Sequence, residues 1–546
     1  MNDERTSEPT TGIPLSAIQD ISVQTGGFGA EYRNVRSGVV NVVTKEGNPD
    51  RYSGTISFRN SSPTQKHFGI SPYDKNSFWN RPYFDDDVCW TGTNNGNWDE
   101  YTQRQYPSFD GWNSVSQQTL ADNDPINDLA PSGAQKLFTW ENRKNGAISL
   151  PDYNIDAGFG GPVPLLSKKL GNLRFFASFR SEHDAYLYQV SRPGLNKVSS
   201  LIKLTSDLSK SMKLSFSYIA GELQATTLSR GGGASYMNDV WDLASQVNMR
   251  GFTMPWRLFT DIYWSSSTVN NATTAMKLTH QLSQRSFYEV LVKFDEKNYH
   301  TWHGARRDTT RDNEILDGYY VDDSPEGFWG SPYFSVDGRL AFGGAVSTAR
   351  DTSIIRSFTI KSDLTSQYNR TNQIKAGMEF VYNDLDLQFG SRNEFLPEGN
   401  YWTSMTQQPY RLSMYAQDKL EHQGFVAIAG LNLDFVNPNG EWYVLDVYDD
   451  QFYSSNYSPE QDAQFQKEKL KGDMSLSPRL AISHPITEVS KLYFNYGHYQ
   501  QMPIAQDLYR IRRGNNNEVI NMGDPVLPMA KTISYELGYD HAFKDM

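Results

Sequence analysis

Apolar and polar residues alternate with a period of two along many stretches of the chain, which predicts half-buried β-strands. In residues 213–218, Leu214, Phe216 and Tyr218 fall on one face, with serines between them on the other. The same alternation recurs at residues 288–295, 374–382, 492–496 and 533–540. One face is aromatic and aliphatic, and the other is mostly polar, charged or glycine. This pattern fits either a soluble β-sandwich with one wetted face or a membrane β-barrel.

The lengths of the connections favour the barrel. We place about 14 strands on the pattern, with long and short connections alternating between most of them. Long loops at one end and tight turns at the other are typical of outer-membrane barrels. A soluble sandwich has no comparable reason to place all its long connections at one end. The 12 tryptophans all fall in the long connections. The expected strands lie near residues 52–60, 153–162, 173–185, 198–206, 212–223, 272–282, 287–299, 352–367, 372–389, 408–421, 424–436, 477–485, 490–500 and 531–543.

Composition narrows the class of protein further. Tyrosine (32), phenylalanine (29) and glycine (41) are abundant, and no stretch reaches the roughly 18 apolar residues of a transmembrane helix. The formal net charge of −12 argues against nucleic acid as a partner, because binding a polyanion needs a basic surface. The single Cys89 allows neither an internal disulfide nor a cysteine metal cluster. Residues 1–12 lack the basic start and apolar run of a signal peptide.

The N-terminal segment carries the most specific motif. Residues 18–32 read IQDISVQTGGFGAEY, and residues 36–47 read RSGVVNVVTKEG. Together they resemble the end of the plug domain of TonB-dependent receptors, in which a short strand leads into a glycine turn, and a small-residue pair then precedes an apolar closing strand. A glycine hairpin with a buried strand explains the composition but not the order of these residues. The positions that carry the resemblance are Gly26, Gly27, Gly29, Tyr32, Ser37, Gly38 and Asn41.

A second motif follows at Gly158-Phe-Gly-Gly-Pro-Val-Pro164, a basic turn, and residues 173–179. It resembles the first periplasmic turn of such receptors, most closely in the Bacteroidota-type branch that is Oar-like or carries a carboxypeptidase-regulatory-like domain. The glycines do not indicate a dinucleotide loop, because no helix pattern follows and Pro162 and Pro164 oppose one.

The resemblance implies an all-β protein: a partial transmembrane antiparallel up-and-down β-barrel, about 14 of roughly 22 strands, with a remnant of the plug domain. Residues 1–48 would be the C-terminal part of the plug. Residues 49–546 would be the N-terminal part of the barrel, with long extracellular loops. The family's signal peptide, its TonB box and the first half of its plug do not fit into residues 1–18, so we expect a fragment.

Few residues in the sequence suggest a metal site or a catalytic site. His300 and His303 lie close together in sequence but lack a third ligand in register. Aspartates at 85–87, at 122, 124 and 128, and at 446, 449 and 450 do not match the spacing of a calcium-binding EF-hand loop, and solvated acidic loops explain them better. We expect no catalytic residue, metal or cofactor. Aromatic rings stack on sugars or apolar ligands at low entropic cost, so the ligand-binding candidates are loop tryptophans, although they could equally pack the loops. These are Trp79, Trp90, Trp98, Trp112 and Trp402.

The resemblance implies an outer-membrane receptor for TonB-energised uptake of a nutrient ligand: a glycan, a peptide or a metal chelate. Its partners would be outer-membrane lipid and lipopolysaccharide, a TonB-type energising protein whose contact region lies outside this chain, and a surface lipoprotein. The alternative is a passive outer-membrane adhesin or structural barrel protein, which would also have aromatic loops but needs no plug. A soluble β-architecture enzyme acting on carbohydrates would instead need carboxylates that converge on a cleft.

Overall fold

A computed structural model describes residues 4–543 of the chain, with gaps. The residues outside the description within that range are 6–11, 37, 64–65, 67–68, 72–73, 79, 107, 122–124, 126–127, 142–149, 188–189, 228–235, 238–239, 248–263, 303–307, 324–334, 337–339, 342–347 and 393–400.

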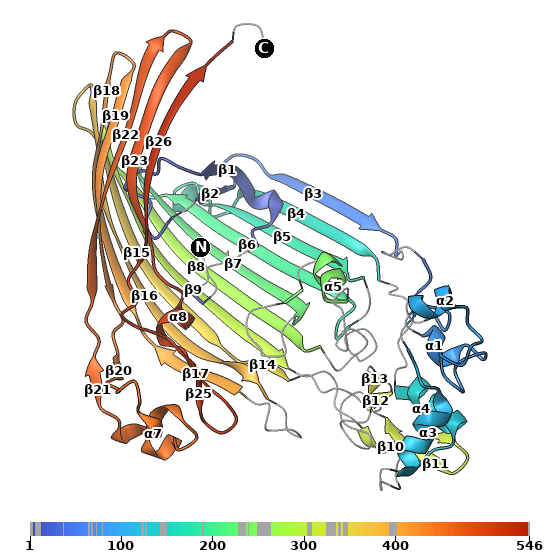
Figure 1. Cartoon of the computed structure of the whole chain (residues 1–546). Coiled ribbons are helices and arrows are strands. Elements are labelled where there is room, and N and C mark those ends of the chain that lie inside the picture. The colour runs from blue at the N-terminus through green and yellow to red at the C-terminus, as the bar shows by residue number, and fades with distance from the viewer. Residues whose placement is uncertain are drawn as a thin grey trace.

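One large antiparallel sheet of 18 strands dominates the fold and curves around a concave side (Figure 1). Each strand expected from the period-two pattern is present, most of them longer than expected and extended towards the long connections. These strands form the wall of the fold. They are β3 (Ser53–Ser61), β4 (Asp152–Pro162), β5 (Arg174–Ala185), β6 (Gly194–Asp207), β7 (Met212–Thr226), β8 (Ser266–Ser283), β9 (Ser286–Trp302), β15 (Ile354–Gln367), β16 (Asn372–Ser391), β18 (Tyr410–His422), β19 (Phe425–Asn437), β22 (Asp473–Thr487), β23 (Ser490–Gln501) and β26 (Ala530–His541).

The wall strands pair with their neighbours in chain order, from β3 at one edge to β26 at the other. Strand pairing closes into a ring only locally. The short strand β14 (Ala349–Asp351) pairs with both β9 and β16, and β15 also pairs with both and lies between them. The residue registers give β3 one partner, β4, and give β26 one partner, β23. Figure 1 shows β3 (blue) and β26 (red) as the two edges of the sheet.

The two faces of the sheet differ as the alternation predicts. One row of directly paired residues crosses nine strands on the outer face and is apolar at every position, while the next row, on the concave face, contains Lys203, Ser217, Lys293, Thr359 and Arg411. The outer side chains of this row are exposed or half-exposed, and none is buried; Met276, for example, is 50% exposed. Burial of apolar groups in the core therefore does not explain the alternation. The apolar row is Leu204, Phe216, Met276, Val292, Ile360, Phe380, Leu412, Phe435 and Met474.

Short turns join the wall strands at one end of the sheet. The β18–β19 turn consists of Gln423 and Gly424, both with positive φ (49° and 82°). Two such residues make the tight turn whose twist matches that of antiparallel strands.

The long connections gather at the opposite end (Figure 1) and carry the remaining short strands and helices. The strands are β10 (Asp308–Leu316), β11 (Tyr319–Asp323), β12 (Ser335–Val336), β13 (Leu340–Ala341), β17 (Tyr401–Gln407), β20 (Glu441–Tyr443), β21 (Lys467–Lys469), β24 (Ile511–Arg513) and β25 (Val519–Met522). The helices are α1 (Arg81–Phe84), α2 (Glu100–Gln105), α3 (Trp112–Ala121), α4 (Pro131–Glu141), α5 (Val240–Val247), α7 (Asp450–Tyr453), η5 (Pro459–Gln464) and α8 (Ala505–Tyr509). No helix among the described residues is long and apolar enough to cross a membrane.

The connection between β3 and β4 is more ordered than the sequence suggested. Instead of an irregular loop it contains α1 to α4, which pack around a small aromatic core. The Trp112 indole is fully buried, donates a hydrogen bond to the Tyr83 carbonyl oxygen (2.8 Å) and lies 5.3 Å from the Phe138 ring. Cys89 is buried beside this core, and burial raises the pKa of its thiol to about 11, so the thiol stays protonated at neutral pH.

Candidate functional site

The described residues of the N-terminal segment, 4–5, 12–36 and 38–47, lie on the concave side of the sheet (Figure 1). Its 3-10 turn η1 (Leu15–Ala17) leads into β1 (Ile18–Gln24), which pairs with β2 (Val39–Thr44) in a separate two-stranded sheet. Every registered pair of these two strands is internal to the hairpin, for example Val23 with Val40. The expected closing strand at residues 39–43 is therefore not part of the wall. A second 3-10 turn, η2 (Lys168–Leu170), lies outside this segment, in the short connection between β4 and β5.

The start of the hairpin is attached to the middle of β4 and β5. The Asp156 carboxylate accepts hydrogen bonds from the backbone N–H groups of Leu15 (2.7 Å) and Ser16 (2.8 Å). Ala17 is fully buried against Phe176 and Leu201. A carboxylate that accepts two backbone hydrogen bonds holds this turn in one position on the polar face.

The glycine turn at residues 26–29 packs against side chains of the far half of the wall. The buried Phe28 ring lies 5.2 Å from Tyr499, edge to face. Gln417 accepts a hydrogen bond from the Ala30 N–H (2.8 Å), and Arg479 donates one to the Gly29 carbonyl oxygen. Gly27 has φ +62°, the region that favours glycine.

Glycines in a tight turn often allow close approach to other backbone, but here a Cβ added at Gly26 or Gly27 would meet side chains, those of Glu536 and Asn495. A Cβ at Gly29 would also meet side chains, those of Glu31 just after the turn and of Gln417 on β18. Side chains of the concave face reach inward across the space, so the turn is held by them.

The other expected plug residues lie around this turn and hairpin. Tyr32 is half-buried beside Phe28, and its N–H donates to the Gly29 carbonyl oxygen (3.2 Å). Asn41 pairs with Ser22 inside the hairpin, and Gly38 precedes β2. Ser37 lies outside the described residues.

Arg33 is a deeply buried cation at this interface, with 2% of its side chain exposed. Its guanidinium lies 3.5 Å from carboxylate oxygens of Asp363 and of Glu379, and 4.9 Å from the centre of the Tyr415 ring. It joins the N-terminal segment to β15, β16 and β18 through charge and ring contacts. No local pattern in the sequence predicts this role, because the partners of Arg33 lie more than 300 residues away.

The end of the segment is anchored by Glu46 at the short-turn end of the wall. Its carboxylate lies 3.2 Å from Arg174, 3.3 Å from Lys213 and 3.7 Å from Lys203. A Cβ at the following Gly47 would lie only 2.2 Å from the Phe175 carbonyl oxygen, so the chain passes directly against the backbone of β5. Burial pushes the pKa of Glu46 upward, but the two lysines and Arg174 outweigh it and hold this pKa below its usual range.

The depressed pKa of Glu46 predicts an acid-sensitive anchor. A carboxylate with a lowered pKa in the docked state stabilises that state above its ordinary pKa of about 4.3, and this contribution is lost as pH falls through the lowered value. We expect hydrogen exchange at residues 44–47, corrected for intrinsic rates, to accelerate over that acidic window. In Glu46→Gln it should be fast at every pH. The control is Glu488→Gln, at an exposed turn carboxylate, which should behave as wild type; protection of wild-type residues 44–47 that persists below the window would contradict the prediction.

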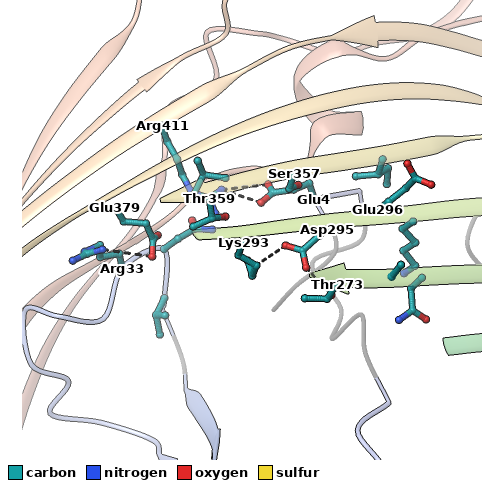
Figure 2. A pocket seen from close by; sticks show the side chains of 17 residues that line it. Glu4, Arg33, Thr273, Lys293, Asp295, Glu296, Ser357, Thr359, Glu379 and Arg411 are labelled. Carbon is teal, nitrogen blue, oxygen red and sulfur yellow. Dashed lines mark hydrogen bonds and ion pairs between the residues drawn. The ribbon is translucent and has the colours of Figure 1, made fainter. Parts of the chain in front are cut away.

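A cavity of about 320 Å³ lies between this segment and strands β8, β9, β15, β16 and β18 (Figure 2). Side chains of both charges line it, and several pair with one another: Arg411 with Glu4 at 3.0 Å, and Lys293 with Asp295 at 2.6 Å. The Asp295 carboxylate also accepts a hydrogen bond from Thr273 (2.7 Å). The cavity is therefore a polar space whose charges are largely compensated.

The ligand-binding candidates are dispersed at the loop end. Trp98 and Trp112 are 7% and 0% exposed, so they pack the helical connection and offer no open ring face. Trp90 is half-buried there, and Trp79 lies outside the described residues. Trp402 lies on β17 and lines a second cavity of about 460 Å³. His300 stacks on Trp302, 6.0 Å away, while His303 is outside the described residues. Among the described residues, no three potential metal ligands converge.

Comparison with known proteins gives one family. The family described as "TonB dependent receptor-like, beta-barrel" matches residues 216–545, more than half of the chain. No curated protein sequence matches the chain.

Several solved structures share the fold at low sequence identity. A mutant of the ferric enterobactin receptor PfeA from Pseudomonas aeruginosa has a TM-score of 0.51 at 12% identity, covering 99% of this chain and 58% of its own. The FrpB iron transporter from Neisseria meningitidis has a TM-score of 0.51 at 10% identity, covering 98% and 60%. The siderophore receptor PirA from Acinetobacter baumannii has a TM-score of 0.50 at 11% identity, covering 97% and 56%. The chain thus spans less than two thirds of the length of each.

Proposed function

The chain belongs to the TonB dependent receptor-like β-barrel family, and from this premise we propose that it is an outer-membrane receptor for energised uptake of a nutrient ligand. It would bind the ligand at the loop end and move it past the N-terminal segment without making or breaking bonds in it. Residues 1–48 would act as part of a plug and residues 49–546 as barrel wall with extracellular loops.

The observation that carries this proposal is the way the N-terminal segment is held. Its strands pair only with each other, and the described contacts with the wall are mostly made by side chains, through Asp156, Arg33 and Glu46. Such contacts lie on a polar face, where water can replace them when the segment moves. A displacement of the segment therefore breaks no β-ladder of the wall.

The apolar outer face of the sheet supports a location in the outer membrane. Exposed aromatic and aliphatic side chains such as Phe216, Met276 and Phe358 suit contact with hydrocarbon, while the polar face encloses the segment. We therefore propose outer-membrane lipid and lipopolysaccharide as surroundings, a TonB-type protein as the source of energy, and a surface lipoprotein as a further partner. No residue of this chain is assigned to the TonB contact.

The membrane location predicts an asymmetry between neighbouring residues. An arginine facing lipid near the bilayer centre costs about 2–4 kcal/mol, and much less on the polar side. We expect Phe216→Arg to lower the yield of folded protein in membranes, and the adjacent Ser217→Arg to leave it near wild type. The measurement is the folded fraction in isolated outer membranes. Equal yields for the two variants would argue against the membrane assignment.

The motif at residues 158–164 supports the Bacteroidota-type, Oar-like or carboxypeptidase-regulatory-like branch of the family. The ligand is a glycan, a peptide or a metal chelate. The solved relatives are named as siderophore or iron receptors, which makes ferric chelates the first probes to try, although likeness at this identity concerns the fold alone.

Uptake by cells tests the proposal. Cells carrying the native gene, and cells in which it is deleted, would be given radiolabelled ferric chelates, labelled glycans and labelled peptides, each with and without an uncoupler of the proton gradient. We expect gene-dependent accumulation of at least one probe that the uncoupler abolishes, while binding at the cell surface survives. Gene-dependent surface binding without energised accumulation would instead support the passive adhesin, which needs no plug-like segment.

A further inference from the structure

The second cavity, of about 460 Å³, lies at the loop end between β17, β24 and the connection that carries α7 and η5. Aromatic rings form much of its lining: Tyr401 and Trp402 on β17, Tyr443 at the end of β20, and Tyr457 between α7 and η5. Its volume lies in the range of pockets that hold small molecules, roughly 300–1,000 Å³.

Two arginines line this cavity, and a third stands behind one of its rings. The guanidinium carbon of Arg392 lies 5.1 Å from the Trp402 ring centre, and that of Arg513 lies 3.4 Å from Tyr457. Arg512 lies 3.7 Å from Tyr401, and its Nε is buried without a hydrogen-bond partner. Each guanidinium is thus held on a ring face.

The charge of these arginines is at most partly compensated within the described residues: Asp462 acts on Arg513, but at longer range than an ion pair. None of the three makes an ion pair there, and no carboxylate lines the cavity. The nearby Asp462 is already engaged: it accepts hydrogen bonds from Tyr443 (2.7 Å) and Tyr457 (2.9 Å) and pairs with Lys467 (2.8 Å). In a chain of net charge −12, this concentration of unpaired positive charge in a cavity marks a place for an anion.

The rings around the cavity are fixed before any ligand arrives. The Trp402 indole donates to Gln388 (3.2 Å), and Arg513 donates to the carbonyl oxygens of Phe452 (2.8 Å) and Asn517 (2.7 Å). Burial and then Asp462 raise the pKa of Tyr457 to about 12, so its hydroxyl remains the donor that orients the ring. Fixed rings and guanidinium groups lower the entropy cost of binding a flat ligand.

We propose that this cavity is a ligand subsite that binds an aromatic carboxylate, or an equivalent planar anion, with its charge at Arg392 and Arg513 and its flat face against Trp402 and Tyr401. The subsite deepens the proposed function, because it names a chemical class for the ligand of the receptor. Asn515 and Asn517, which also line the cavity, would supply neutral hydrogen-bond donors.

Calorimetric titration of the full-length protein in detergent tests the subsite with three probes: 2-naphthoate, its uncharged analogue 2-naphthamide, and acetate. We expect naphthoate to bind at least roughly tenfold more tightly than either of the others, because only naphthoate has both the charge and the flat face. Naphthoate and naphthamide binding with equal affinity would overturn the role of charge. Acetate matching naphthoate would overturn the role of the rings.

Variants assign the effect to residues. Arg392→Gln and Arg513→Gln should each weaken naphthoate by roughly tenfold and leave naphthamide unchanged. Arg392 decides the outcome, because Arg513 also holds loop carbonyls, whereas the contact described for Arg392 is its ring stacking. Arg510→Gln is the matched control: Arg510 lies in the same connection but bonds to Asn521 and Gln506 away from the cavity, so naphthoate affinity should not change. An unchanged affinity in Arg392→Gln would overturn the proposal.

The titration tests the subsite and the uptake assay tests the receptor function, so either proposal can fail while the other stands. Naphthoate binding that depends on Arg392, in a protein that accumulates no probe in cells, supports the subsite and refutes energised uptake. Energised uptake by a protein whose affinity for naphthoate is unchanged in Arg392→Gln supports the receptor function and refutes the subsite.

Discussion

Replacing Arg33 by alanine is expected to detach the glycine turn from the far half of the wall. Arg33 is buried, and it lies between the carboxylates of Asp363 and Glu379 and over the ring of Tyr415. Removing one partner of a buried ion pair costs about 3–5 kcal/mol, since the other charges stay behind without compensation. The 3.5 Å separations are longer than a tight ionic hydrogen bond, which places the expected cost near the lower end.

Hydrogen exchange measures this loss directly. The Ala30 N–H donates to Gln417 only while the turn is docked, so its exchange rate reports the docking equilibrium. A loss of about 3 kcal/mol corresponds to exchange roughly 100-fold faster at residues 28–32. Arg36→Ala, at an exposed position of the same segment, should leave the rate unchanged. Equal protection in the two variants would show that Arg33 does not hold the turn.

The wall could be predicted from the sequence because its signal is local. Alternation over a few residues, as in Leu214, Phe216 and Tyr218, fixes both the strand and the face that each side chain takes. In the alternating stretch 492–496, Phe494 lies on the apolar face and is paired with Leu537, which is 77% exposed. A shift of one residue would turn every side chain to the wrong face, so the pattern specifies the register strongly.

The candidate site could be predicted only in part, because its contacts join distant segments. The glycine turn is visible as a motif, but nothing near Arg33 or Glu46 in the sequence indicates their partners on the wall. Composition alone also does not separate a tryptophan that binds a ligand from one that packs a core: Trp112 is fully buried, whereas Trp402 lines a cavity. The arginines that line the cavity with Trp402 are the distinguishing feature: Arg392 lies close to Trp402 in the sequence, but Arg513 comes from a distant connection.

The largest effect is expected at the two edges of the sheet, when the 546-residue chain is placed alone in a bilayer. β3 and β26 each have one registered partner, so about half of the backbone groups of each strand face away from the sheet. That leaves on the order of ten N–H and ten C=O groups without partners, each costing several kcal/mol in hydrocarbon. The sum, tens of kcal/mol, exceeds the roughly 5–15 kcal/mol net stability of a typical fold. We therefore expect the isolated chain to leave both edge strands unprotected and to transport nothing.

Two measurements on the isolated chain in lipid vesicles test this expectation. Amides of β3 and β26 should exchange rapidly, while those of β15 and β16, which have partners on both sides, should be protected and serve as the internal control. The double variant Ser57→Cys and Glu536→Cys carries one cysteine on the concave face of each edge strand and should form no disulfide, because the two strands are not neighbours. An efficient disulfide together with protected edge amides would mean that the wall strands close on themselves. A smaller barrel of that kind would remove both rows of unpaired groups, and the energetic argument for an unstable edge would then be wrong.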